Sequence, residues 1–400
     1  MALVVRVTGD CPSCGLEKGF GNVGVHHDHV LRGCKRCSHR EQVTLPEVKK
    51  KVLYLDQSLL SSAFRENDTT AVALVERVKQ IALDQLLVAP YSSVHEDETH
   101  MLQVTKPEVV SELMEFIKRT SGGLQFEPAY EVEHTQVHDA YYRWLAGEPA
   151  PSALDRHDAI EDEVDEWSDY FFIDVPGYFG DPAVNDANKR AALTQLLDAI
   201  DEWRVSDLSF DDAVRLELHS AGQEYIRAYI QMIARVAAGD VLAPLTAPVI
   251  TLVLQGMLTG CEGDEMLRRF RNLPDFFASE HFAECPFQWV SVRMFAVLRH
   301  QVRHDQAYTN REKAEKKLLG FAHDVRHIAT YAPYCDAIFV DNAMAHILRD
   351  GRLALEKRYG TRVFSRSSQA EFEAWLSEVE DSMDDFHRAA LGLIHPERDA

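Results

Sequence analysis

Four acidic residues stand at points in the sequence from which carboxylates can meet at one edge of a β-sheet. Asp56 ends the run VLYLD, and Asp341 ends the run AIFVD. Glu98 follows the apolar run LLVA, and Asp324 lies near the start of a segment with helical periodicity. Gathered carboxylates bind hard divalent cations such as Mg2+ and Mn2+ through oxygen. Such an ion activates water for phosphodiester hydrolysis, so no protein nucleophile is required.

Four apolar runs of strand length are separated by segments with helical periodicity. The expected strands are residues 52–55, 86–89, 337–340 and 361–364, and a single helix is expected over 342–360 between the last two. Because strands and helices alternate, we expect an α/β fold with a mainly parallel sheet. Asp56 and Asp341 each follow a strand directly, at the carboxyl edge where parallel sheets bind their ligands.

Helices are expected to carry the other two acids. Asp324 lies in the first turn of a helix that ends near Tyr331, where the helix dipole favours a carboxylate. Ser93 is expected to be the N-cap of an earlier helix, with Glu96 completing a capping box, and Glu98 lies further along that helix. A single acid in such a position commonly caps a helix or forms a turn. The prediction of a site therefore depends on all four acids meeting at one edge.

Two cysteine pairs, CPSC and CKRC, precede the first expected parallel strand with 19 residues between them. The four candidate ligands are Cys11, Cys14, Cys34 and Cys37. This spacing is typical of a zinc ribbon, in which four thiolates surround one Zn2+ tetrahedrally. A four-Cys site has no open coordination position, so we expect a structural zinc. The alternative is a mixed site that uses histidines of the HHDH segment or His39.

The order of these parts resembles the PIN family of metal-dependent nucleases. An Asp follows the first strand, Ser93 and Glu98 form a Ser-x4-Glu pair after the second, and two further Asp residues mark a helix start and a later strand end. The opening YLDQS is similar to bacterial PIN-like variants that begin with Leu-Asp-Gln. The resemblance covers residues 52–100 and 322–370, about a quarter of the chain.

The resemblance implies a PIN-like parallel sheet flanked by helices and the activity of a metal-dependent endonuclease. The implied catalytic acids, which would bind Mg2+ or Mn2+, are Asp56, Glu98, Asp324 and Asp341. Asp336 lies close in sequence and is assigned a peripheral place in the metal site. RNA is the preferred substrate over DNA, and a role as a toxin or phage-defence effector is implied in the same way.

We divide the chain into four segments. They are a zinc ribbon at 1–48, the first part of the PIN-like domain at 49–110, a helical insertion at 111–320 and the second part of the PIN-like domain at 321–400. The insertion is far longer than is usual in the PIN family. We expect this acidic insertion to hold the activity in check until a regulatory protein partner or ligand arrives.

Three other interpretations compete with a nuclease of this kind. The HAD phosphatases need a second acid two residues after the first, where this chain has Ser58. The segment RHQVRH gives Arg299 and His304 the R-x4-H spacing of HEPN ribonucleases, although an ordinary amphipathic helix also explains it. The alternative from a different class is a noncatalytic adaptor, in which the ribbon and the helical insertion bind nucleic acid or protein.

The net charge of −22 weakens any nonspecific attraction to nucleic acid. Residues 1–51 differ, because nine Lys or Arg against five acids give them a local charge of +4. The beginning of the chain shows no secretion signal, so we expect a cytoplasmic protein without a disulfide framework. Residues 241–260 contain no charged side chain and are about as long as a membrane span. Pro244 and Pro248 interrupt this stretch, so we expect a buried helix instead.

Overall fold

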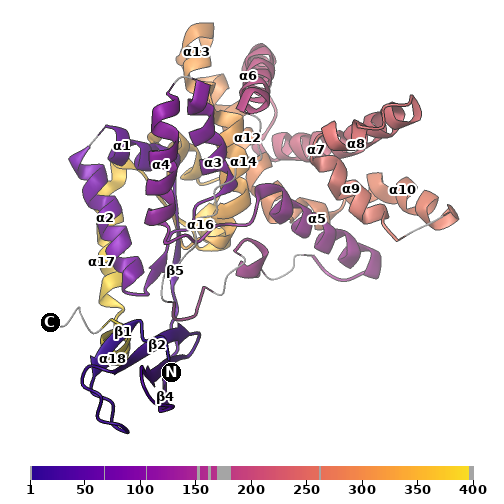
Figure 1. Cartoon of the computed structure of the whole chain (residues 1–400). Coiled ribbons are helices and arrows are strands. Elements are labelled where there is room, and N and C mark those ends of the chain that lie inside the picture. Colours follow the sequence, from indigo (N-terminus) through magenta and orange to yellow (C-terminus); the bar gives the residue numbers. More distant parts are fainter. Residues whose placement is uncertain are drawn as a thin grey trace.

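The fold is mixed α/β, with two four-stranded sheets surrounded by helices (Figure 1). The computed structural model describes residues 2–66, 68–104, 106–150, 154–160, 164–168, 182–260 and 263–395. The smaller sheet is formed by the beginning of the chain. The larger sheet is parallel, as the alternation of strands and helices predicted, and it lies at the centre of the molecule.

The N-terminal sheet is antiparallel, and its strands pair in sequence order. Its strands are β1 (Arg6–Gly9), β2 (Phe20–His26), β3 (His29–Cys34) and β4 (Arg40–Thr44). Buried Val30 of this sheet packs in one apolar cluster with Ile394 of the last helix, α18 (Asp385–Ile394). The side-chain amide of Asn22 also donates to the backbone oxygen of Leu393 at 2.8 Å. The two ends of the described chain are therefore packed together.

The central sheet has the strand order β6-β5-β7-β8, and every neighbouring pair is parallel. Its strands are β5 (Lys51–Leu55), β6 (Leu87–Val88), β7 (Ala337–Phe339) and β8 (Arg362–Phe364). All four lie within a residue or two of the predicted strands. In the two central strands, Leu53 pairs with Ala337 and Leu55 with Phe339. Strands more than 280 residues apart thus meet in the middle of the sheet.

One face of the sheet is covered by helices from both predicted parts of the PIN-like domain and from the segment between them. They are α1 (Gln57–Arg65), α2 (Thr69–Leu83), α4 (Pro107–Thr120) and α17 (Gln369–Asp381). Leu53, Leu55 and Phe339 point into this layer. Both faces of a parallel sheet are buried, which explains why the strands are apolar without alternation.

The opposite face is covered mainly by helices that the sequence had assigned to the insertion. They are α5 (Ala129–Ala146), α6 (Pro182–Val205) and α12 (Pro286–His304), joined by α14 (Phe321–Tyr331), α15 (Asn342–Leu348) and α16 (Leu355–Tyr359). Val52, Tyr54 and Ile338 point into this layer. The segment 111–320 therefore completes the core of the central sheet instead of lying apart from it.

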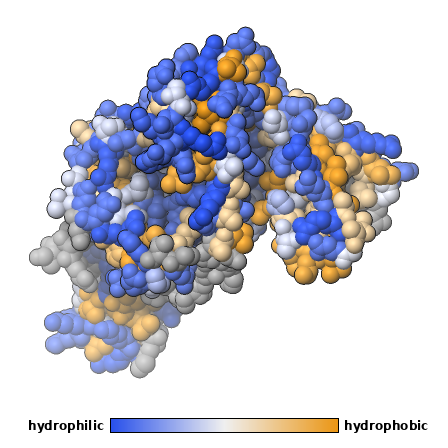
Figure 2. Space-filling view, turned by 90° about the horizontal axis from the view of Figure 1, so that it is seen from above, coloured by the Kyte–Doolittle hydropathy of each residue, from blue (hydrophilic) through white to orange (hydrophobic). Residues whose placement is uncertain are grey.

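Other helices of the same segment form an arm that projects from the sheet (Figure 1). They are α7 (Phe210–Ala237), α8 (Ala243–Thr246), α9 (Ile250–Leu258), α10 (Gly263–Phe277) and α11 (Glu280–Ala283). An aromatic cluster that includes Tyr225, Phe276 and Phe282 holds the arm together. Hydrophobic and hydrophilic side chains alternate over its surface in the view from above (Figure 2).

The uncharged stretch 241–260 lies in this arm and forms two short helices, α8 and α9. Val253, Leu254 and Met257 of α9 are buried, which confirms the predicted core helix. Within the described ranges, no helix has both the length and the apolar character needed to cross a membrane.

Two predicted helix boundaries were wrong. Helix α3 (Ser93–Met101) is capped by Ser92, and its capping partner is His95, whose Nδ1 accepts from the Ser92 backbone N–H at 3.0 Å. Because the N-cap is Ser92, the third helical position of the capping box is His95 and not Glu96. The single helix expected over 342–360 is two helices, α15 and α16, because the Asp350 side chain accepts from the Arg352 backbone N–H at 2.9 Å and forms a turn.

The remaining elements are short. They are α13 (Arg311–Leu318) and the 3-10 turns η1 (Leu102–Val104), η2 (Arg156–Asp158), η3 (Gln306–Thr309), η4 (Ala332–Tyr334) and η5 (Arg366–Ser368).

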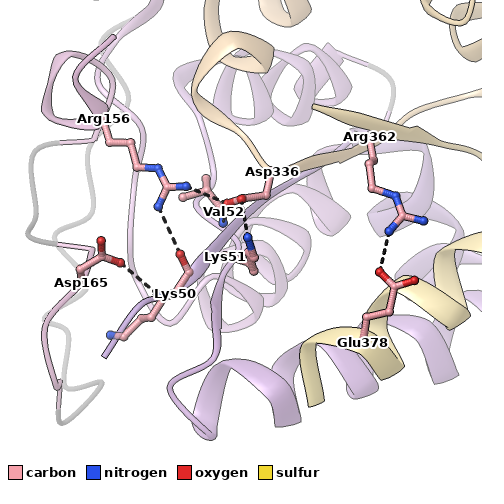
Figure 3. A network of polar contacts seen from close by, with 8 residues as sticks. All are labelled: Lys50, Lys51, Val52, Arg156, Asp165, Asp336, Arg362 and Glu378. Atoms are coloured by element: carbon pink, nitrogen blue, oxygen red, sulfur yellow. Dashed lines mark hydrogen bonds and ion pairs between the residues drawn. The ribbon is translucent and has the colours of Figure 1, made fainter. Parts of the chain in front are cut away.

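An ion-pair network holds the amino-terminal end of the central strands (Figure 3). Asp336, just before β7, accepts hydrogen bonds from Lys51 Nζ, from the Val52 backbone N–H and from the Arg156 guanidinium, each at 2.9 Å. Its side chain is only 17% exposed. A carboxylate with a backbone donor and two cations joins β5, β7 and η2 at this end of the sheet.

We predict that Asp336→Ala lowers the free energy of unfolding by about 1–3 kcal/mol, because it leaves the Val52 N–H and two cations without their acceptor. Thermal unfolding measures the loss. Glu378→Ala is the matched control, since its pair with Arg362 at 2.7 Å is exposed and contributes about 0–1 kcal/mol. Equal effects of the two substitutions would contradict this account of the network.

Candidate functional site

The four cysteines of the N-terminal sheet come together in one cluster. The Sγ atoms of Cys11 and Cys37 are 3.7 Å apart, and those of Cys14 and Cys34 are 3.6 Å apart. Zn–S bonds of about 2.3 Å in a tetrahedral site place the sulfurs about 3.8 Å from one another. All four ligand atoms lie within 4.8 Å of one another, so the cluster is compatible with a zinc site.

The backbone around the cluster favours the thiolate form of Cys34. The N–H groups of Arg36 and Cys37 approach Cys34 Sγ at 3.3 and 3.5 Å. These backbone N–H groups lower the pKa of Cys34 to about 6. Thiolates are the form that binds zinc. The predicted four-Cys set is thus assembled, while His26 and His29 of the alternative set lie at the opposite end of the β2–β3 hairpin.

Two of the four predicted acids cap helices at the carboxyl end of the central strands. Asp56 follows β5, and its Oδ2 accepts from the Ser58 backbone N–H at 3.0 Å. Asp341 follows β7, and its Oδ1 accepts from the Met344 backbone N–H at 2.7 Å. Because β5 and β7 are paired neighbours, the two aspartates lie next to each other at the carboxyl edge of the sheet. Their capping role and a role in a metal site do not exclude each other.

The other two acids approach the same edge from helices. Glu98 lies in α3, which follows β6, and Asp324 lies in the first turn of α14. Helix α14 begins after Gly320, whose positive φ of 91° turns the chain into the helix. A Cβ at Gly320 would lie 3.6 Å from Asp324 Oδ2 and 3.8 Å from Lys189 Nζ. These are ordinary contact distances, so the positive φ and not a lack of space accounts for glycine at this position.

The electrostatics of the acids show that they share one environment. Burial raises the pKa of Asp56, and the Asp341 carboxylate adds to this. Burial raises the pKa of Glu98 to about 7, with a further contribution from Asp56. Burial also raises the pKa of Asp324 well above its ordinary range, and Asp56, Glu98 and Asp341 all act in the same direction. Each of these carboxyls is therefore harder to ionise because of the others.

The acids are close enough to interact but are not yet arranged around one ion. Among the described residues, only the four cysteines form a group of three or more candidate ligands that all lie within 4.8 Å of one another. Side-chain movement must therefore accompany any binding of a single ion by the acids.

Sequence reasoning missed three residues beside the acids. Lys189 of α6 lies 3.9 Å from Glu98 Oε1, and His323 Nε2 lies 4.0 Å from the same oxygen. His327 packs against His323 with ring centroids 4.4 Å apart. The two histidines are four residues apart in a helix that the sequence predicted. Their spacing therefore places both on one face of that helix and could have identified them. Lys189 gave none, since its position depends on how a distant helix packs.

A cleft of about 700 Å3 opens beside the acids, and Asp324 and Asp341 contribute to its wall. Its other polar lining includes His300, His304, His346, Lys316, Lys317 and Arg352. Part of this positive charge is paired locally, because Lys317 binds Asp305 at 2.5 Å and Arg352 binds Asp350 at 2.6 Å.

Two other residues singled out in the sequence lie away from the acid cluster. Asp336 is at the opposite end of β7 from Asp341 and takes part in the network of Figure 3, so the structure does not bring it to the site. Arg299 of the R-x4-H segment is buried, binds Glu217 at 2.9 Å and lies over the Trp203 ring at 5.0 Å. His304 instead lines the cleft, so this pair does not form a common site.

Comparison with protein-family models, with curated proteins and with solved structures found no match. The geometry of the two clusters is therefore the basis for any functional proposal.

We predict that the purified chain contains one zinc ion per molecule and that Cys34→Ser lowers this content to near zero. One of four thiolates is lost, and the ribbon is too small to fold without its metal. Metal analysis of the protein provides the measurement. Cys285→Ala, which removes a buried thiol outside the cluster, is the control and is expected to keep its zinc. Zinc retained in Cys34→Ser would argue against the four-Cys site.

We further predict that Glu98→Gln stabilises the protein at high pH when no Mg2+ or Mn2+ is present. The folded state holds the Glu98 proton up to about pH 7, whereas the unfolded chain releases it near 4.5. Stability therefore falls as the pH rises through this window, by up to about 3 kcal/mol. The variant lacks this loss, so it should match the wild type at pH 4 and exceed it at pH 8.

Thermal unfolding at the two pH values tests this prediction. Glu131→Gln is the matched control, because Glu131 is an exposed carboxylate on α5. A difference between Glu98→Gln and wild type that does not change with pH would show that Glu98 is not held in the environment described.

Proposed function

We propose that the chain is a metal-dependent nuclease with a PIN-like domain, which hydrolyses phosphodiester bonds and prefers RNA to DNA. The observation that carries the proposal is the convergence of four carboxylates, from β5, β7, α3 and α14, at the carboxyl edge of a parallel sheet. The resemblance in the order of parts supports the PIN-like assignment. The preference for RNA and a role as a toxin or phage-defence effector rest on that resemblance alone.

The donor set fits a hard divalent cation, because every predicted ligand is a carboxylate oxygen. The residues that would hold Mg2+ or Mn2+ are Asp56, Glu98, Asp324 and Asp341. When bound, such an ion polarises a phosphoryl oxygen and makes a water molecule nucleophilic at neutral pH. The chain itself orients two of the ligands, through the N–H groups of Ser58 and Met344. Lys189 offsets part of the negative charge beside Glu98.

The cleft supports a polymeric substrate. Its wall carries Asp324 and Asp341 together with the cations Lys316, Lys317 and Arg352, and each of these cations has an acidic partner that a phosphate would have to replace. A strand lying in this cleft would bring its phosphates to the acids. The ribbon itself, residues 1–48, has six Lys or Arg against five acids, so its local charge of +1 adds only a small attraction for the phosphates of a nucleic acid.

The test is a cleavage assay with labelled single-stranded RNA, single-stranded DNA and duplex DNA in Mg2+, Mn2+ or EDTA. We predict metal-dependent cutting of RNA that Asp56→Asn and Asp341→Asn each reduce at least about 100-fold, because each removes a charged ligand. Asp198→Asn is the matched control, since this carboxylate is exposed on α6, and it should retain full activity.

Two results would contradict the proposal. Cutting that persists in both amide variants would place the chemistry elsewhere. The absence of cutting for every substrate, in protein that has its zinc and is folded, would favour the adaptor, in which the ribbon and the arm bind a partner and the acids are inert.

A further inference from the structure

Two imidazoles beside the acid cluster have buried nitrogens without a hydrogen-bond partner. They belong to His323 and His327, which lie one turn apart on α14 with ring centroids 4.4 Å apart. The Nε2 atoms of both are buried, and neither makes a hydrogen bond. His327 is only 4% exposed. Buried polar atoms are normally paired, so two neighbouring exceptions at a candidate site point to a missing ligand.

The distance from His323 to Glu98 fits one metal ion between them. Nε2 of His323 and Oε1 of Glu98 are 4.0 Å apart, which is too long for a hydrogen bond. A divalent transition ion binds imidazole nitrogen and carboxylate oxygen at about 2.0–2.2 Å. Two such ligands of one ion are therefore at most about 4.3 Å apart. That limit applies to ligands on opposite sides of the ion, and at octahedral or tetrahedral angles the two atoms are about 3.0–3.5 Å apart. Both side chains therefore reach a common ion after a shift of about 0.5–1 Å.

A nitrogen ligand changes which metals the site prefers. Mg2+ favours oxygen ligands and gives up its waters reluctantly. Imidazole binds first-row transition ions much better, and sites with both histidine and carboxylate commonly hold them. His323 precedes Asp324 directly, so the two residues bring nitrogen and oxygen ligands to the same edge from one helix turn.

We propose that His323 and Glu98 share a transition-metal position, and that this position gives the site a preference for a divalent transition ion such as Mn2+ over Mg2+. The inference rests on the proposed nuclease site and deepens it by naming the class of metal. His327 acts as a positioning residue, because its ring packs edge-on against His323 and limits the orientations of that ring.

Pulsed electron paramagnetic resonance of Mn2+ bound to the full-length, zinc-loaded chain tests the proposal. We expect nitrogen hyperfine coupling to the bound Mn2+ in the wild type and its loss in His323→Gln. The cysteine ligands of the ribbon contain no nitrogen, so the coupling reports on the acid site. His300→Gln is the matched control, because this histidine lies on α12 in the wall of the cleft and is expected to keep the coupling.

A second readout is the ratio of Mn2+ to Mg2+ affinities, which we expect to fall at least about tenfold in His323→Gln and to stay unchanged in His300→Gln. The inference is overturned if the wild type binds Mn2+ without nitrogen coupling, if the coupling survives in His323→Gln, or if the wild type binds no Mn2+ at all. A wild-type spectrum without nitrogen coupling overturns the inference whatever the variant does, and His323→Asn takes the place of His323→Gln should the latter fail to fold.

Parallel cleavage assays separate this inference from the proposed function. Nitrogen coupling without cleavage of any nucleic acid would support the metal position and count against the nuclease. Cleavage in Mn2+ without nitrogen coupling would support the nuclease and overturn the role of His323.

Discussion

The parallel pairing of β5 with β7 is the constraint on which the rest of the structure depends. Leu53 to Leu55 pair with Ala337 to Phe339, and the Asp56 N–H continues the ladder by donating to the Phe339 backbone oxygen at 2.8 Å. This register places Asp56 and Asp341 next to each other at one edge. The two strands are neighbours, so the long segment between them must begin and end at the same part of the sheet. Its helices α5, α6 and α12 pack over one face of that sheet.

The acid cluster is costly to the metal-free protein, and its surroundings only partly offset the cost. Carboxylates that share a buried environment repel one another, and burial adds to the penalty. The Lys189 ammonium opposes the upward pKa shifts of Glu98 and Asp324. Protein interiors rarely keep such groups together without a function, because apolar side chains would pack there at lower cost. A divalent cation would replace the incomplete compensation by Lys189 with direct coordination.

The sequence predicted those features that arise from local patterns. The four parallel strands, the four-Cys cluster and the places of Asp56, Asp341 and Asp324 follow from apolar runs and from the residues next to them. Lys189 and the packing of the segment 111–320 could not be predicted, because they depend on contacts between distant helices. A capping box that ends in Glu predicts Ser93 as the cap of α3, whereas the structure has Ser92 as the cap and the buried His95 as its partner. The peripheral place predicted for Asp336 was wrong for a different reason. Asp336 is close to Asp341 in sequence, but β7 lies between them and puts the two residues at opposite ends of the strand.

The central claim is that the four acids form one site for a divalent cation. The most direct test is calorimetric titration of Mn2+ into the zinc-loaded chain, comparing the wild type with single amide variants of each acid. The account predicts binding to the wild type that is weakened in all four variants, together with proton release on binding near neutral pH, because Glu98 is partly protonated there. Equal binding of Mn2+ to the wild type and to Asp56→Asn would contradict it.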